Sequence, residues 1–222
     1  MALLKGKTAV ITGGSAGVGL AIAKRFAEEG AHVFINGRTQ AELDAAVKEI
    51  GESVTGVQGD GSKPGDRDRL YAAVAEAGRR LDVLFANAVA IDVARIGDVT
   101  QEHLRRALPL LNDGGSIILN SSDGNAEGDN GTGAYAAIVA ALRSLAPTWA
   151  GELRERNIRV NVISPDATET PGLNALAGIL NPGTNAAEES GSCQRGIVPP
   201  GRHATAEEVA DAALFLASGL SS

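Results

Sequence analysis

The sequence predicts a protein of the α/β class, built as a doubly wound parallel sheet of about six strands. Three observations predict it. Short apolar runs alternate with segments of helical spacing along the chain, which is typical of right-handed βαβ units. The apolar runs lack a polar side, as do strands that are buried between two layers of helices. A glycine-rich turn also joins the first apolar run to the first helical segment.

Six short apolar runs bounded by turn residues are the predicted strands. They cover residues 7–14, 31–37, 53–60, 81–88, 115–122 and 158–165. The first, "KTAVITGG", ends in glycines, and the third, "SVTGVQGD", is the weakest because it carries fewer large apolar residues.

Six further segments carry apolar residues at helical spacing and are the predicted helices. They cover residues 19–30, 39–51, 66–80, 100–111, 133–156 and 205–218. Gly30 is the expected stop of the first helix, and Thr39 is the expected N-cap of the second. Pro147 is expected to interrupt the long fifth helix, because an interior proline removes a hydrogen bond and costs about 3 kcal/mol or more.

Composition sets the class of protein. The 222 residues are 44% hydrophobic and 21% charged, so we expect residues 1–222 to form a single domain with a sizeable core. The net charge of −7 argues against nucleic acid or an anionic membrane as a partner. No apolar run approaches the ~20 residues of a membrane span, and "MALLKGKTAVITGG" shows no signal-peptide pattern, so we expect a cytoplasmic location.

Residues 172–204 are rich in Gly, Pro, Asn and Ser. The segment is long for a loop in a compact domain, so we interpret it as a substrate lid. Its Cys193 is the sole cysteine, which excludes an intrachain disulfide, and we interpret it as an incidental loop thiol. The histidines lie without metal-ligand spacing, so we interpret them as surface or loop residues and expect no metal. They are His32, His103 and His203.

The glycine-rich turn "TGGSAGVG", residues 12–19, is a candidate dinucleotide site. It joins a strand to a helix, so the positive helix end and free N–H groups face the carboxyl edge of the sheet, where an anion binds. Glycines let the backbone approach a pyrophosphate, and Gly19 lets the helix pack close to the sheet. The alternative is a tight turn without a ligand. We expect a Rossmann-like site whose contacts include Gly13, Ser15, Gly17, Val18 and Gly19.

The second predicted strand ends in "FINGRTQ". Sites that prefer NAD usually place an acidic residue here for the ribose 2′-hydroxyl, whereas this chain has Gly37 and Arg38. A guanidinium suits a 2′-phosphate, so we favour NADP(H) and keep NAD(H) as the alternative. The other interpretation of Arg38 is a solvated surface arginine.

The pattern Thr-Gly-x-x-x-Gly-x-Gly at residues 12–19 resembles the short-chain dehydrogenase/reductase family, and further segments match in order. "GDGS" places Asp60 at the position of the family's adenine contact. "ANAVA" resembles the Asn-Asn-Ala-Gly segment, with Asn87 in place and Val89 where glycine is usual. "NIRVNVISPDATETPG" resembles the segment that closes on the nicotinamide, with Asp166 replacing its glycine and Thr170 at its threonine.

The resemblance also implies a catalytic pair. Ser122, in "ILNSS", and Tyr135 lie 13 positions apart, which is the family's serine-to-tyrosine spacing. In the family the serine holds the substrate oxygen, the tyrosine is the general acid/base, and a lysine four residues later binds the ribose and lowers the tyrosine pKa. Here that position is Val139. Arg143 is two turns from Tyr135, and we interpret it as a solvent-facing arginine in preference to a substitute cation.

Other departures from the family concern the scaffold. Residues 88–114 are fewer than the family usually has between its fourth and fifth strands. The family's active-site asparagine in the fourth helix has no counterpart here, because Asn112 falls in an expected turn, "LNDGG". The chain ends in "LASGLSS", so we expect the sheet to lack the family's seventh strand.

Two functions from different classes follow. The first is an oxidoreductase that transfers hydride between NADP(H) and a small carbonyl or alcohol, with Tyr135 as acid/base, Ser122 orienting the oxygen, and activity impaired by Val139. The second is a catalytically inactive NAD(P)-binding scaffold or redox sensor. A third interpretation is a chain that folds poorly, which the helix proline motivates. The family is commonly tetrameric, and we expect a homo-oligomer, with a dimer favoured because the tail is missing.

Overall fold

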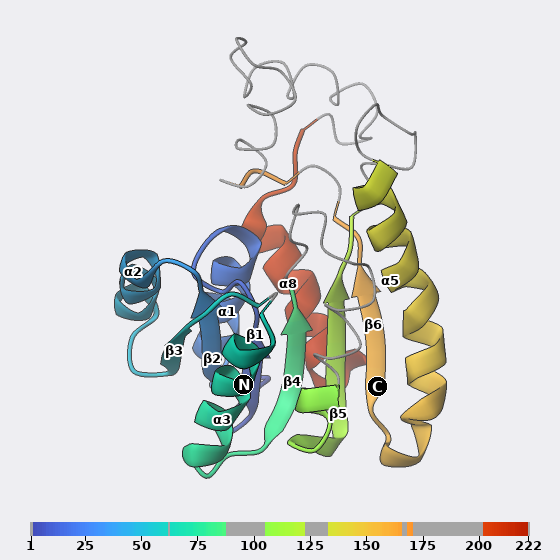
Figure 1. Cartoon of the computed structure of the whole chain (residues 1–222), viewed down its shortest axis with the longest axis horizontal. Coiled ribbons are helices and arrows are strands. Elements are labelled where there is room, and N and C mark those ends of the chain that lie inside the picture. Colours follow the sequence, from blue (N-terminus) through green and yellow to red (C-terminus); the bar gives the residue numbers. More distant parts are fainter. Residues whose placement is uncertain are drawn as a thin grey trace.

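The computed structural model describes residues 2–61, 63–87, 105–122, 133–165, 168–170 and 202–221, with backbone alone at 133–135. Within them a parallel six-stranded sheet has the order β3-β2-β1-β4-β5-β6, which confirms the predicted fold class (Figure 1). The strands are β1 Thr8–Ile11, β2 His32–Gly37, β3 Val54–Gln58, β4 Leu81–Ala86, β5 Leu111–Asn120 and β6 Arg159–Ile163. The order reverses direction between β1 and β4, which is where such sheets bind ligands.

Helices cover both faces of the sheet (Figure 1). They are α1 Gly17–Glu28, α2 Gln40–Ile50, α3 Pro64–Glu76, α5 Gly133–Glu152 and α8 Ala206–Ala217, with short 3-10 turns η1 Arg154–Arg156 and η2 Gly219–Ser221. No helix of the described residues is long and apolar enough to cross a membrane.

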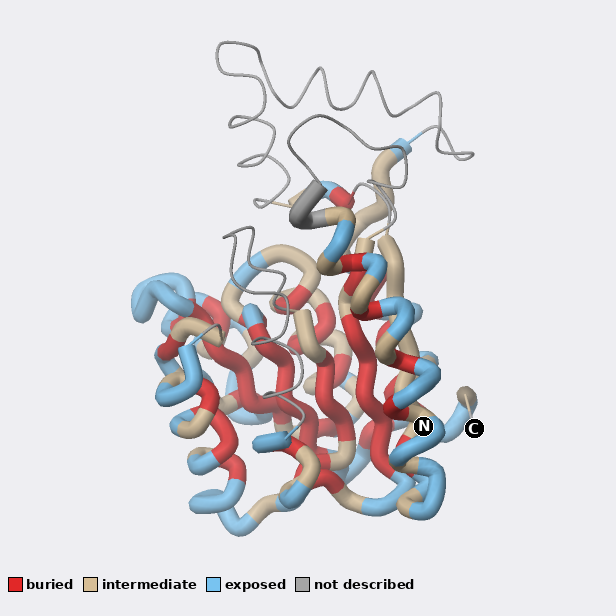
Figure 2. Tube along the Cα trace, turned by 45° about the vertical axis from the view of Figure 1, so that its right-hand side comes forward, coloured by how far each residue is buried: buried red, intermediate tan, exposed pale blue. Residues whose placement is uncertain are grey.

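Alternate residues of each strand enter different cores, because successive side chains point to opposite faces. Ile11 packs with α1 and α8, whereas its neighbour Val10 packs with α3 and α5. The central strands are therefore buried along their lengths, while the outer faces of the helices are exposed (Figure 2). The apolar runs of the sequence predicted this burial.

The fifth helix is continuous through Pro147, so the predicted interruption is wrong. Pro147 is exposed, whereas Leu142, Ala146 and Trp149 are buried against the sheet on either side of it. Packing of this apolar face holds both halves of the helix against one core and offsets the hydrogen bond that the proline cannot make.

The chain before β5 also differs from expectation. Of the predicted helix 100–111, residues 105–107 are helical, 100–104 lie outside the described residues, and Leu111 already pairs with Leu81 as the first residue of β5. Asn112 therefore lies in a strand and not in a turn. The pairing shifts register after Leu81, and Gly114 takes a positive φ of 77°, so the strand begins irregularly.

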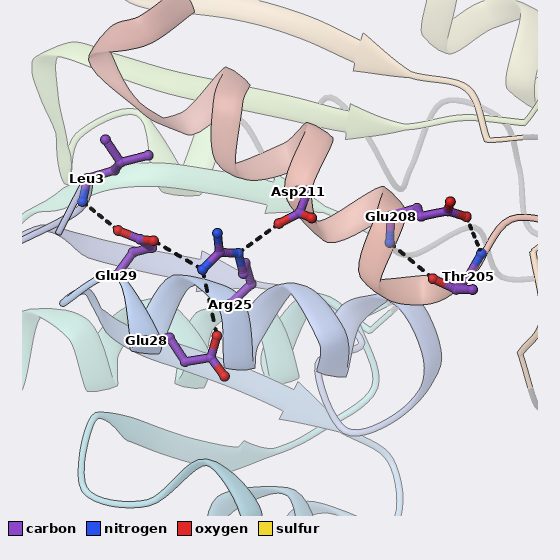
Figure 3. Close-up of polar contacts among 7 residues, drawn as sticks. All are labelled: Leu3, Arg25, Glu28, Glu29, Thr205, Glu208 and Asp211. Atoms are coloured by element: carbon purple, nitrogen blue, oxygen red, sulfur yellow. Dashed lines mark hydrogen bonds and ion pairs between the residues drawn. The ribbon is translucent and has the colours of Figure 1, made fainter. Parts of the chain in front are cut away.

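Helices α1 and α8 are joined by polar contacts (Figure 3). Arg25 Nε donates to Asp211 Oδ1 at 2.8 Å, and its Nη1 donates to Glu29 Oε1 at 3.0 Å. Thr205 caps α8 in a capping box with Glu208, whereas Thr39 stands at the N-cap of α2 without a side-chain hydrogen bond. Thr39 therefore occupies the predicted N-cap position, but its hydroxyl does not cap the helix.

Arg159 of β6 closes the other end of α8. Its Nη1 donates to the carbonyl of Leu216 at 2.7 Å, its Nη2 donates to that of Ser218 at 3.2 Å, and it also contacts the Ser221 hydroxyl. The Leu216 carbonyl also accepts from Ser116 Oγ at 2.9 Å, and a guanidinium at this end of the helix complements the helix dipole.

Candidate active site

The glycine loop, residues 12–19, connects β1 to α1 at the carboxyl edge of the sheet. Gly13 and Gly17 take positive φ angles of 65° and 54°, which side chains disfavour. A Cβ on Gly19 would lie 2.2 Å from the Gly13 carbonyl oxygen, so this glycine is required by the loop itself. Helix α1 begins at Gly17, and Ala16 at its N-cap offers no side-chain hydrogen bond. No side chain at Ala16 competes with an anion for these first N–H groups.

Asn36, near the end of β2, holds the loop from one side. Its Oδ1 accepts a hydrogen bond from the Gly13 N–H at 2.9 Å, and its backbone carbonyl accepts one from the Gly14 N–H at 3.0 Å. Its Nδ2 donates to the Gly59 carbonyl at 3.3 Å. The side chain is 4% exposed. Sequence reasoning missed this residue, although a polar side chain inside the apolar "VFING" is a signal for it.

Asn87, which follows β4, holds the loop from the other side. Its backbone N–H donates to Thr12 Oγ1 at 2.9 Å, and its Nδ2 donates to the Gly13 carbonyl at 3.4 Å. Its Oδ1 accepts a hydrogen bond from Nδ2 of Asn120, the last residue of β5, at 2.9 Å. The predicted Asn87 thus contacts the glycine loop at Thr12 and Gly13. Its third partner, Asn120, is a residue that sequence reasoning did not assign.

Arg38 directly follows β2 and is exposed. Among the described residues its guanidinium has no hydrogen bond or ion pair. The preceding Gly37 lies against the loop, because a Cβ there would be 2.5 Å from Ser15 Oγ. A positive charge therefore stands at the end of the strand that contacts the predicted Ser15.

Asp60 lies just after β3, at the same edge of the sheet, and is half-buried. Its backbone N–H donates to Asp66 Oδ2 at 2.7 Å. This bond, followed by the charge of Arg69, lowers the pKa of the Asp66 carboxyl. The turn that presents Asp60 is thus fixed to the first turn of α3.

Ser122 lies two residues beyond β5 and is half-buried, while Tyr135 occupies the first turn of α5 with a side chain outside the described residues. Val139, one turn after Tyr135, is 2% exposed. Its carbonyl accepts a hydrogen bond from Ser121 Oγ at 3.1 Å, so α5 is attached to the strand that carries Ser122. At the position of the family's lysine the chain places a buried apolar side chain.

Arg143 is exposed, as the interpretation of a solvent-facing arginine predicts, and it also contacts the serine segment. The side chain is exposed, but its Nη2 donates to the Ser122 carbonyl at 3.3 Å. A long arginine can lie back along its helix and keep its head near water. A cation therefore stands at the backbone of the predicted catalytic serine.

The remaining predicted residues are placed less fully. Thr170 is half-buried and follows Thr168, which pairs with Ala204. Val89, Asp166 and the predicted lid 172–204 lie outside the described residues, apart from the last residues 202–204.

His32 is not a loop residue: it begins β2, and its ring nitrogen Nε2 shares a hydrogen bond with Thr55 Oγ1 at 2.9 Å. In the described part of the chain, no group of three or more His, Cys, Asp or Glu is arranged so that it could hold a metal ion.

Known proteins share this arrangement of strands and helices. A model of the short chain dehydrogenase family matches residues 7–177. The chain belongs to the short-chain dehydrogenase family. An oxidoreductase of Sarocladium schorii is 45% identical to this dehydrogenase over 184 residues, which cover 75% of this chain and 74% of that protein.

Two further proteins resemble the dehydrogenase along nearly its whole length. An NADP-dependent (R)-specific alcohol dehydrogenase of Lentilactobacillus kefiri is 33% identical and covers 97% of this chain and 90% of its own. The crystal structure of L-sorbose reductase from Gluconobacter frateurii, complexed with NADPH and L-sorbose, has a TM-score of 0.85 and 30% identity, covering 99% of this chain and 92% of that one. The dehydrogenase is therefore an oxidoreductase of the short-chain type.

Proposed function

We propose that this dehydrogenase transfers hydride between NADP(H) and a small carbonyl or alcohol. The glycine loop carries the proposal, because Asn36 and Asn87 hold it from two sides while Arg38 stands at the neighbouring strand end. The loop would receive the pyrophosphate, Arg38 the 2′-phosphate, and Asp60 the adenine. The similarity to an NADP-dependent alcohol dehydrogenase and to a reductase complexed with NADPH supports the preference for NADP(H). NAD(H) is the alternative cofactor.

Ser122 and Tyr135 are the proposed catalytic pair. When bound, the nicotinamide supplies or accepts the hydride. In the direction of reduction, the Ser122 hydroxyl donates a hydrogen bond to the substrate oxygen, and the Tyr135 hydroxyl delivers a proton to the same oxygen. Arg143 fixes the backbone of Ser122 from the helix that carries Tyr135. Thr170 belongs to the segment that would close on the nicotinamide, with residues 172–204 as the lid of a single domain.

A specific observation favours a second candidate, a dinucleotide-binding protein without turnover. A phenol titrates near ~10 and needs a neighbouring positive charge to act as a base near neutral pH. The buried Val139 supplies none. The two functions share the cofactor site and differ in the chemistry.

NADPH consumption with a panel of small ketones, aldehydes and ketoses tests the proposal. We expect slow turnover by the wild type, and its loss in Ser122→Ala and Tyr135→Phe with NADPH binding retained. Turnover that survives both substitutions contradicts the catalytic pair. NADPH binding without turnover, in the wild type and in both variants, supports the second candidate.

We also propose a homodimer as the assembled state. Phe215 of α8 and Leu220 of η2 are large apolar side chains that are 49% and 63% exposed. Light scattering during gel filtration tests this, with the mass of two chains expected and the mass of one chain contradicting it.

A further inference from the structure

A row of amide hydrogen bonds crosses the carboxyl edge of the sheet. Asn120 donates to Asn87, Asn87 donates to the Gly13 carbonyl, the Gly13 N–H donates to Asn36, and Asn36 donates to the Gly59 carbonyl. We name these five residues the amide chain. Its members lie at the ends of β5, β4, β1, β2 and β3, so it links the strand that leads to Ser122 with the whole dinucleotide edge.

The direction of each bond in the amide chain is fixed by backbone groups. The Gly13 carbonyl can only accept, so Asn87 must present its Nδ2 to it and its Oδ1 to Asn120. Asn120 must then present its own Nδ2. The Oδ1 of Asn120 is consequently turned away from Asn87, where it is buried and has no hydrogen-bond partner among the described residues.

The orientation of the Asn87 side-chain amide therefore depends on Asn120. Without the Asn120 donor, the Asn87 amide loses the partner of its Oδ1 and can rotate away from Gly13, because its remaining bond is long at 3.4 Å. Rotation of the Asn87 amide would change the contacts of Gly13 and Gly19, because both lie against it. A Cβ on either glycine would lie within 3.2 Å of the Asn87 Nδ2. The loop is thus shaped around one orientation of the Asn87 amide.

We propose that Asn120 is a positioning residue for the cofactor, acting through the Asn87 amide on the glycine loop. This inference rests on the proposed function, because it requires that the loop bind a dinucleotide. Its effect falls on affinity for the cofactor, and Asn120 itself does not touch the reacting atoms. It also connects cofactor binding to β5, whose end lies two residues before Ser122.

A double-mutant cycle tests the proposal, with NADP⁺ binding to the full chain measured by calorimetry. We expect Asn120→Ala and Asn87→Ala each to weaken binding by roughly 3- to 10-fold, and the double variant to be no weaker than Asn87→Ala alone. Effects that multiply would show that Asn120 acts independently of Asn87 and would overturn the proposal. If the wild type binds no NADP⁺, the proposed function itself fails. If the wild type binds NADP⁺ but the two effects multiply, only the inference about Asn120 fails.

Asn112→Ala is the matched control. Asn112 lies at the opposite end of β5, is likewise half-buried, and uses its amide to accept from Arg80 Nε at 2.7 Å and donate to Asp82 at 3.2 Å. It should lower the thermal midpoint as Asn120→Ala does, yet leave NADP⁺ affinity unchanged. An equal loss of affinity in this control would reduce Asn120 to a structural residue.

Asn120→Asp adds a readout that a loss of packing does not give. Ionised aspartate cannot donate to Asn87 Oδ1, whereas the protonated carboxyl can. We expect the ratio of variant to wild-type Kd for NADP⁺ to fall toward one as the pH is lowered from 7 to 4, because the ordinary pKa of an aspartate carboxyl is about 3.9. The ratio corrects for titration of the cofactor itself. A ratio that stays constant with pH contradicts the donor function of Asn120.

Discussion

The hydroxyl of Ser121 donates a hydrogen bond to the carbonyl oxygen of Val139, 3.1 Å away. This contact attaches the helix of the predicted tyrosine to the segment that carries the predicted serine, and the Val139 side chain is buried. The two segments that carry the proposed catalytic pair are therefore joined at Val139, the position where the resemblance predicts a lysine.

Val139→Lys should raise carbonyl reduction near pH 7, because an ammonium near the phenol favours its ionised form. It should also lower the thermal midpoint, since a buried lysine loses hydration. Val139→Met, which has an unbranched apolar side chain, is the matched control and should leave activity unchanged. Steady-state rates at equal folded fraction, from pH 7 to 10, measure the effect. If lysine and methionine give equal rates, the missing cation does not limit the reaction.

Asn36→Asp should weaken NADPH binding and lower stability, because the carboxylate keeps the bond from the Gly13 N–H but cannot donate to the Gly59 carbonyl. An unsatisfied buried group costs about 1–3 kcal/mol, and we expect a loss of this size in the free energy of unfolding. Urea denaturation measures it. Asn157→Asp, a substitution at the left-handed end of η1, provides the surface control. A buried site that tolerates aspartate without loss would contradict the importance of the Gly59 bond.

Arg38→Ala should reduce the preference for NADPH over NADH and leave NADH affinity nearly constant. The guanidinium makes no other hydrogen bond or ion pair among the described residues, so its removal costs the fold little. Arg154→Ala, which removes an exposed arginine of η1, controls for the change in net charge. The Kd values for NADPH and for NADH are measured separately. An equal loss of affinity for both would show that Arg38 acts through its charge in general and does not contact the 2′-phosphate.

Stability should fall as the pH drops below about 6.5 because of His32. Burial, assisted by the charge of Arg79, lowers the pKa of His32 from its ordinary value of 6.5. The unfolded chain then takes up its proton first, so the stabilisation is complete above pH 6.5 and declines toward the lower folded pKa. Urea midpoints of wild type and His32→Gln at pH 7.5 and 5.5 measure this. The variant should lose less stability on acidification. Equal losses would show that His32 does not cause the pH dependence.

Thr205→Ala should destabilise the chain by about 1 kcal/mol, because the hydroxyl accepts the Glu208 N–H at the start of α8. Arg202 and the Thr205 N–H hold the pKa of Glu208 at about 2, so the capping box remains formed in mild acid. Thr148→Ala, at an exposed position within α5, should cost nothing. Thermal unfolding of both variants at pH 7 and pH 4 provides the comparison, and equal midpoints would show that the cap is not needed.

The sequence predicts the fold well because apolar periodicity is set by burial. All six strands and the glycine loop lie where the pattern indicates them. Pro147 was misjudged because local propensity yields to the packing of Leu142 and Trp149. Asn112 was misjudged because "LNDGG" has turn composition, while the pairing of Leu111 with Leu81 extends the strand.

Parts of the site were beyond the reach of sequence reasoning. Asn36 and Asn120 act through neighbours that are distant along the chain, and only the strand order places them beside Gly13 and Asn87. The contact of Arg143 with the Ser122 carbonyl depends on a side-chain path that helical spacing does not specify.

The most direct measurement is a titration of the wild-type chain with NADPH and with NADH, followed by the fluorescence of the bound nicotinamide. We expect saturable binding of both, with NADPH bound at least several-fold more tightly. Saturation by NADH with equal or higher affinity would contradict the assignment of Arg38 to a 2′-phosphate. Absence of binding by either would contradict the dinucleotide site itself.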